Sequence, residues 1–175
     1  SEAEEALRKV EELIRRVKKR DDEAVKEVRE LNKRIADILR EVLETVRKLL
    51  EDVEKALRDG SDKREARKLL EEILEAVKRA ADRIEDLIRR SNEAVRRVVE
   101  ESRDLIKRIL EEVERAPVEE DILRTLRELV RDLERKSEES LKELNRLNED
   151  LKREVKRVLD ELEELVRRLK KKVDD

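Results

Sequence analysis

Apolar residues recur along the first third of the chain at alternating steps of four and three. This spacing places them on one face of an α-helix and, sustained over many repeats, is typical of a coiled-coil seam. The predicted seam runs through Ala3, Leu7, Val10, Ile14, Val17, Asp21, Val25, Val28, Asn32, Ile35, Leu39, Val42, Val46, Leu49, Val53 and Ala56. Asp21 and Asn32 are its only polar members, and two steps of four meet at Asp21. Such a stutter locally relaxes a left-handed supercoil.

The same pattern returns twice. The second seam consists of Ala66, Leu70, Ile73, Val77, Ala80, Ile84, Leu87, Ser91, Ala94, Val98, Ser102, Leu105 and Ile109. The third consists of Ile122, Leu126, Leu129, Leu133, Ser137, Leu141, Leu144, Asn148, Leu151, Val155, Val158, Leu162, Leu165 and Leu169. Each again contains two polar members and one stutter, so the sequence predicts three helices that share one pattern of seam residues.

Only two stretches can interrupt these helices. In residues 58–65, Gly60 suits a left-handed C-terminal cap and Ser61 or Asp62 suits the following N-cap. Asp62 with Glu65 has the spacing of a capping box. In residues 115–121, Pro117 suits the first turn of a helix, with acidic residues after it. We therefore expect helices at about 2–59, 62–116 and 118–173 in a single domain, 1–175. Each has about 55 residues and a length of about 80 Å.

Short connections make consecutive helices antiparallel. The predicted fold is all-α: an antiparallel, left-handed three-helix bundle or coiled coil. In each helix the two polar seam residues lie eleven positions apart. When the chain reverses direction at the two connections, the polar residues of the three helices come to the same two levels of the bundle. One predicted layer consists of Asn32, Ser91 and Asn148, and the other consists of Asp21, Ser102 and Ser137. Layers of this kind fix helix register at some cost in stability.

The polar layers admit other interpretations. Serines beside a carboxylate could be a nucleophile and its orienting acid, but no histidine exists to act as base and no lysine lies on the seam. A partner-binding role is a further alternative. Asn92, Ser140 and Asn145 flank the layers either as additional network members or as surface polar residues.

Composition narrows the function further. Charged residues make up 55% of the 175 positions, aromatic residues, Cys, His and Met are absent, and the net charge is −3. Acidic and basic residues alternate at helical spacings, which indicates a solvated surface rather than a one-sided nucleic-acid footprint. No apolar run is long enough for a membrane span. Without His or Cys we expect no metal site, and with one glycine no phosphate loop, so we expect no cofactor and no enzymatic activity.

The chain resembles a computationally designed helical bundle of the parametric kind that carries buried hydrogen-bond networks. The resemblance rests on the loops DGSD and RAPVEED, the surface repeats RKVEELIRRVKKR and LEEVER, the missing aromatic residues and the equally spaced polar layers. It covers the whole chain. Natural spectrin-like units, by contrast, carry core aromatics.

The resemblance implies a structural scaffold with no natural activity. From the complete layers we expect a monomer with no required partner, and from the composition a soluble chain that contacts neither nucleic acid nor membrane. The alternative is an open helical module that binds a further helix, or that self-associates as a subunit of a designed heterodimer or homo-oligomer. Pairs of adjacent apolar residues, such as Leu49 and Leu50, make the seams wider. They are compatible with both the closed scaffold and the open module. The complete three-member layers favour the closed bundle.

Overall fold

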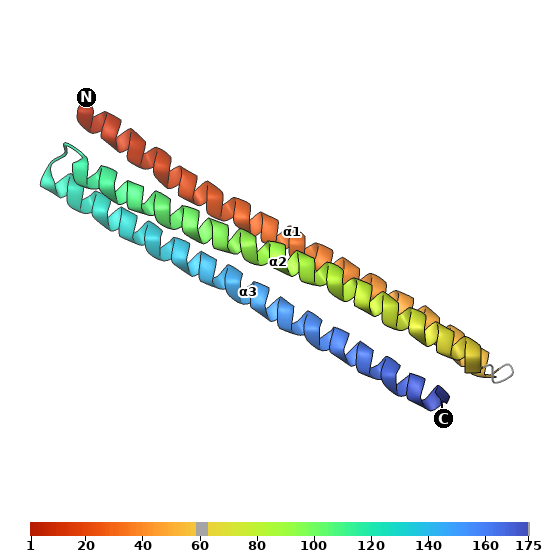
Figure 1. Ribbon diagram of the computed structural model, residues 1–175. Helices are drawn as coiled ribbons and strands as arrows, with labels where there is room; N and C mark the ends of the chain where they lie inside the picture. Colours follow the sequence, from red (N-terminus) through yellow and green to blue (C-terminus); the bar gives the residue numbers. More distant parts are fainter. Residues whose placement is uncertain (59–62, 175) are drawn as a thin grey trace. The chain divides into compact units, whose positions relative to one another are not determined.

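The computed structural model describes residues 1–58 and 63–174 of the chain, and all regular structure in these ranges is helical (Figure 1). Three helices follow one another: α1 (Glu2–Arg58), α2 (Lys63–Arg115) and α3 (Glu120–Asp174). They consist mostly of strong helix formers such as Ala, Leu, Glu, Lys and Arg, with no Gly or Pro inside any of them. The predicted all-α fold of three long helices is therefore confirmed. The predicted caps, at Gly60 and at Ser61 or Asp62, lie outside the described residues.

The start of α1 is stabilised by its first residue. The Glu4 amide donates to the Ser1 hydroxyl at 3.3 Å, and the Glu5 amide donates to the Ser1 carbonyl at 3.1 Å. Ser1 thus acts as an N-cap, satisfying amides that have no partner within the helix. Acidic side chains in the first turn and basic ones in the last turn, Lys55 and Arg58, complement the helix dipole.

The connection between α2 and α3 corrects one prediction. We expected Pro117 in the first turn of the third helix, but α3 begins at Glu120, so Pro117 lies in the connection. The Val118 amide donates to the Ala116 carbonyl at 2.9 Å, which closes a three-residue γ-turn around the proline. The first α-helical bond of α3 is then donated by Leu123 to the Glu119 carbonyl. The fixed φ of proline is compatible with either conformation, so the sequence alone did not distinguish them.

The chain divides into two compact units, and each contains one segment of every helix. The first unit comprises Ser1–Glu30 and Ser91–Asn148, and the second comprises Leu31–Arg90 and Glu149–Asp175. In each unit the α1 and α2 segments run antiparallel, because the chain reverses direction between them (Figure 1). The single domain of 1–175 and the left-handed supercoil stay predictions.

Apolar side chains from all three helices form the core of each unit. In the second unit one cluster includes Ile35, Val42, Leu70, Ile73 and Val166. In the first unit there are two clusters. One is built around Val10, Val17, Ile109, Val113 and Val130, and the other around Val28, Ala94, Val98, Leu141 and Leu144.

Burial follows the predicted seams closely in α1 and α2 and less closely in α3. Every predicted seam residue of α2 is buried, and none of those of α1 is exposed. In α3, however, Ile122, Leu129 and Leu165 are 44%, 53% and 42% exposed, so their placement in the seam was wrong. Val130 and Val166, one position further along, are fully buried. One residue turns a helix by about 100°, and the doubled apolar positions fit both alignments.

Candidate functional site

The polar residues that the sequence singled out lie largely in the interior. Ser91, Ser102, Ser137 and Asn148 retain 0%, 1%, 4% and 1% of their accessible surface, and all four belong to the first unit. A buried hydroxyl or amide costs free energy unless it finds a hydrogen-bond partner. Their partners therefore decide what this region can do.

Asp21 is the acceptor of one hydrogen-bonded group. The Ser102 hydroxyl of α2 donates to its Oδ1 at 2.7 Å, and the Ser137 hydroxyl of α3 donates to its Oδ2 at 2.8 Å. The carboxylate is partly buried, and each of its oxygens is held by a different helix. Hydrogen bonds to a charged acceptor are stronger than neutral ones and require close alignment of donor and acceptor. All three helices of the first unit thus meet at one side chain.

Asn148 is the centre of a second group. The Ser91 hydroxyl of α2 donates to its Oδ1 at 2.7 Å, and its Nδ2 donates to the Oδ1 of Asn92. Asn92 is thus a member of this network, one of the two roles that the sequence left open for it. Ser140 and Asn145 are exposed.

Asn32, the remaining residue of the predicted layers, lies in the second unit. Its side chain is partly exposed, but its Oδ1 is buried and has no hydrogen-bond partner among the described residues. Its membership of a layer with Ser91 and Asn148 stays a prediction. An amide oxygen left in this state is unfavourable by about 1–3 kcal/mol, so it marks a place where a donor would be stabilising.

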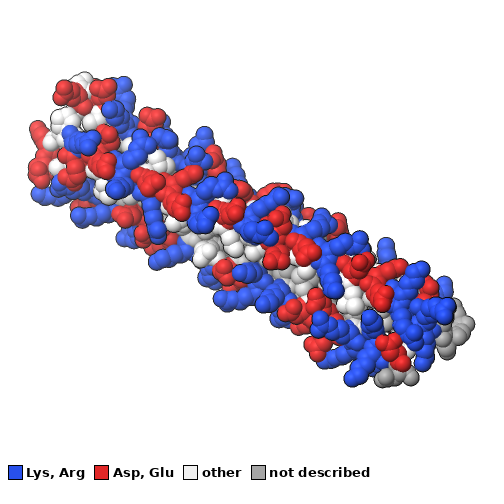
Figure 2. All heavy atoms as spheres, in the orientation of Figure 1, with Lys and Arg blue, Asp and Glu red and all other residues white. Residues whose placement is uncertain are grey.

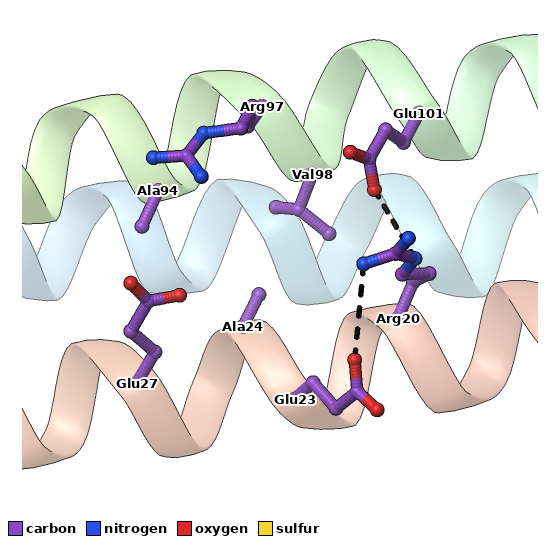
Figure 3. Close-up of a pocket in the computed structure, with 8 residues that line it drawn as sticks. All are labelled: Arg20, Glu23, Ala24, Glu27, Ala94, Arg97, Val98 and Glu101. Carbon is purple, nitrogen blue, oxygen red and sulfur yellow. Dashed lines mark ion pairs between the residues drawn. The ribbon is translucent and has the colours of Figure 1, made fainter.

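A shallow hollow lies close to the Asp21 group, between α1 and α2 of the first unit (Figure 3). Ala24, Ala94 and Val98 line it, and its volume is about 90 Å³. At one end, Arg20 lies 3.2 Å from Glu101 and 3.9 Å from Glu23. The hollow is large enough to hold ordered water, since one water molecule needs about 10–15 Å³ of such space. Its short side chains and exposed ion pairs provide no nucleophile and no deep apolar site for a ligand.

The chain carries basic and acidic residues in nearly equal number, 47 and 50. Figure 2 shows basic and acidic side chains interspersed over the face that it displays. Among residues 1–58 and 63–174, no group of three or more acidic side chains is placed to hold a metal ion. No helix in the same ranges is long and apolar enough to cross a membrane.

One ion pair joins the end of α2 to the start of α3. The Arg127 guanidinium donates to both carboxylate oxygens of Glu114, at 2.7 and 2.8 Å. The hydrogen bond from Arg127 lowers the pKa of Glu114 from its ordinary value of 4.5, and the charge of Arg127 acts in the same direction. Both groups face solvent, so the pair contributes little to stability.

In the Asp21 group, two hydroxyls donate to one carboxylate, and the chain contains no histidine that could activate either serine. What the geometry can do is hold three helices at one mutual position.

Comparison with known proteins gives a family and a fold. The family model described as Grap2 and cyclin-D-interacting, N-terminal, matches residues 1–119, a stretch that ends immediately before α3. The chain belongs to this family. A solved structure titled "Computationally designed three helix bundle" superimposes with a TM-score of 0.63 at 20% sequence identity. The alignment covers 97% of this chain and 92% of that one, and it shows the shared fold. None of the curated proteins compared matches the chain.

Proposed function

We propose that this chain is a structural scaffold, a monomeric single-domain bundle without catalytic activity in which buried polar side chains fix the helix register. The observation that carries the proposal is the Asp21 carboxylate, whose two oxygens accept hydrogen bonds from Ser102 and Ser137 on the two other helices. Apolar seams with a seven-residue repeat can slip by one heptad and still bury Leu, Ile and Val. A carboxylate that meets two hydroxyls in only one alignment removes that freedom.

The composition and the regular polar spacing support a designed origin, which we include in the proposal. Local helix propensity, apolar pattern and capping agree along the chain to a degree that natural proteins rarely maintain. The designed bundle of the same fold is consistent with this origin.

Helix register can be tested by distance measurements between spin labels. The chain has no cysteine, so Cys introduced at positions 20 and 101, which face each other on α1 and α2 beside the Asp21 group, would carry the only two labels. The parent protein should give one narrow distance distribution. In the triple variant Asp21→Leu, Ser102→Ala, Ser137→Ala we expect a second population displaced by about 10 Å, the length of one heptad.

A matched label pair at positions 41 and 79 reports on α1 and α2 in the second unit, where this network does not reach. Because α1 and α2 are each continuous through both units, a slip by one heptad displaces both label pairs together, so this pair should give one narrow distribution in the parent protein and a second population in the triple variant. If both pairs keep a single narrow distribution in the triple variant, the network does not set the register and the proposal fails. A particle mass of 21.0 kDa in sedimentation equilibrium is the expected result for the monomer.

A second candidate function is that of a protein-interaction module. The description of the matching family names interactions with other proteins, over the region that corresponds to α1 and α2. The structural observation in its favour is a set of large apolar side chains left exposed on α1 and α3. Such side chains are common on surfaces when scattered singly, but a contiguous set indicates an interaction site.

A further inference from the structure

The three helices contribute unequally to the apolar cores. Among the described residues of the first unit, α1 provides five buried apolar side chains, α2 seven and α3 four. In the second unit the corresponding numbers are six, seven and four. Of the exposed large apolar side chains in the same ranges, α3 carries Ile122, Leu129, Leu147 and Leu165, whereas α1 carries two and α2 none. In each unit, therefore, α3 is the least buried helix.

Ion pairs at the surface do not reverse this order. They join α2 to α3 at Glu114 and Arg127, at Arg67 and Asp174, and at Glu71 and Lys170. Among the described residues, α1 is joined to another helix by one ion pair, that of Arg20 with Glu101. An exposed pair contributes little to stability, whereas each additional buried aliphatic side chain contributes several times as much. We therefore expect α3 to be the first helix to open.

The contacts between α1 and α2 do not require α3. In the first unit, the Ser102 hydroxyl donates to the Oδ1 of Asp21 at 2.7 Å, and Arg20 lies 3.2 Å from Glu101. Two helices with apolar seams can also form a coiled coil without a third. The family match agrees with this division, because it covers α1 and α2 and ends immediately before α3. The pair of α1 and α2 can therefore keep its fold when α3 is displaced.

The face that α3 covers in the first unit has a polar pattern of its own. The Ser137 hydroxyl of α3 donates to the Oδ2 of Asp21 at 2.8 Å, and Asn148 of α3 accepts from the Ser91 hydroxyl at 2.7 Å. A wholly apolar helix in the place of α3 would leave Asp21 without this donor and Ser91 without its acceptor, which is unfavourable for buried groups. Ser137 and Asn148 are eleven residues apart, about 16 Å along α3. A helix that replaces α3 must therefore carry a hydroxyl and, eleven residues later, a carboxamide in its apolar seam.

We propose that α3 is a displaceable cover, and that the face of α1 and α2 beneath it in the first unit binds one helix of a partner protein. That helix has an apolar seam with a Ser opposite Asp21 and, eleven residues later, an Asn opposite Ser91. The proposal rests on the second candidate function, interaction with other proteins. It names the surface and the chemistry of the partner.

A partner helix fits this face better than the α3 of a second copy. The chain's own α3 competes at an effective concentration on the order of millimolar, so an occupant must bind more favourably than α3 does. In this unit α3 leaves Leu129 and Leu147 exposed and buries only four apolar side chains. A helix whose large apolar residues all face α1 and α2 buries more apolar surface. A second copy offers the same α3, which gains nothing over the one in place.

The opening of α3 can be measured in the unmodified chain by native-state hydrogen exchange, followed by mass spectrometry. After correction for intrinsic rates, we expect amides of α3 to exchange at least about tenfold faster than those of α1 and α2, because they require only α3 to open. Equal protection of the three helices would overturn the cover, and so would faster exchange in α1.

Binding to the uncovered face can be measured with a synthetic peptide of residues 120–151, which carries Ser137 and Asn148. The receptor is the full-length variant Leu133→Asp with Leu144→Asp, in which carboxylates at two buried positions of α3 release this helix. In titration calorimetry we expect the variant to bind one peptide, at least about tenfold more tightly than the parent does, because the parent's own α3 competes.

Changes in the peptide test the polar pattern. Ser137→Ala with Asn148→Ala should weaken binding at least about tenfold, since their hydrogen-bond partners on α1 and α2 are then left unpaired. The matched control, Ser140→Ala with Asn145→Ala, changes the same residue types at exposed positions of α3 and should leave binding unchanged. Equal binding of all three peptides would overturn the proposed chemistry of the partner.

A second receptor tests whether α3 differs from α1. The variant Val17→Asp with Val28→Asp places the same charges at two buried positions of α1, and its probe is a peptide of residues 2–33. We expect this pair to bind at least about tenfold more weakly than the α3 pair, because α2 and α3 without α1 retain fewer buried apolar contacts. Equal binding would show that either helix can be replaced and would overturn the cover.

Circular dichroism will show whether each receptor variant keeps its helical content, and if the α3 variant unfolds, hydrogen exchange of the parent still tests the cover. Equally tight binding of the peptide of residues 120–151 to the parent and to the α3 variant would overturn the proposed face but leave the interaction function standing. If this peptide binds neither protein, both fail. A dimer of the parent formed by exchange of α3 would identify a second copy as the occupant and overturn the proposal.

Discussion

The two units of the chain use the same helices but divide polar and apolar residues differently. All four buried polar residues belong to the first unit, where the apolar core is split into two clusters of nine and seven buried residues. The second unit has one continuous cluster of seventeen. Among its described residues, one buried side-chain oxygen, that of Asn32, has no hydrogen-bond partner.

The Asp21 group explains the division of the first core. Along every helix its residue falls in the gap between the two clusters: Asp21 after Val17, Ser102 after Val98 and Ser137 after Leu133. A polar layer prevents apolar side chains on its two sides from packing together. Its hydrogen bonds can form in only one register of the three helices. Under the proposed function, the first unit supplies specificity at the expense of continuous packing, and the second supplies packing.

Cavities placed in the two cores should have unequal effects, and this is the largest difference we expect. Ile73 in the second unit and Ile109 in the first are both fully buried. Ile73→Ala should lower the free energy of unfolding by about 2–5 kcal/mol, the range for Ile truncated in a core. Ile109→Ala should fall near the lower end, because a smaller cluster collapses more readily around a cavity. Urea unfolding followed by circular dichroism measures both, and equal losses would contradict the comparison.

Removing the central carboxylate should have an intermediate effect. Asp21→Ala leaves the hydroxyls of Ser102 and Ser137 without their acceptor, at a cost of about 1–3 kcal/mol. Each serine can instead donate to a carbonyl of its own helix, which places the loss toward the lower value.

The triple variant Asp21→Leu, Ser102→Ala, Ser137→Ala should regain this stability or exceed the parent, since apolar packing then joins the two clusters. The same urea titrations measure it. A triple variant less stable than Asp21→Ala would show that the polar layer stabilises the first unit in addition to specifying it.

The smallest effect concerns the surface pair between α2 and α3. The Arg127 hydrogen bond lowers the pKa of Glu114 in the folded state, so its stabilising contribution is present above about pH 4.5 and is lost as the pH falls through the folded value. Glu114→Gln should therefore lower the thermal midpoint slightly at pH 7, and the difference from the parent should vanish in acid.

Asp132→Asn is the matched control within one helix. The pKa of Asp132 is also lowered, chiefly by its hydrogen bond with Lys136 four residues later on α3. Its difference from the parent should vanish in acid in the same way. However, only Glu114→Gln should change the separation of spin labels placed on α2 and α3. Equal changes in that separation for both variants would contradict an interhelical role of the Glu114 pair.

Much of this architecture could be predicted from the chain, and the errors are informative. Steps of three and four predicted the helices, and all seam residues of α2 are buried as expected. The seam of α3 was wrong at Ile122, Leu129 and Leu165, because apolar neighbours such as Leu129 and Val130 allow two alignments about 100° apart. The local sequence contains no information on which alignment the other two helices select.

For the candidate site, too, the sequence predicted one part and left another part open. Polar residues on an apolar seam are visible in the sequence, so Asp21, Ser91, Ser102, Ser137 and Asn148 could be named without a structure. The hydrogen bonds themselves could not be predicted in this way. Asp21 accepts hydrogen bonds from two hydroxyls, and Asn92 accepts one from Asn148, and each of these bonds joins side chains of different helices.

By itself, then, the sequence determined which segments are helical and which polar residues interrupt their seams, since propensity and periodicity act within one helix. The tertiary structure decided which doubled apolar residues are buried, which polar atoms pair and which leucines remain exposed on α1 and α3. Each of these depends on the rotation and position of one helix against two others. That geometry is set by the packing of all three at once and is not encoded in the repeat of any one of them.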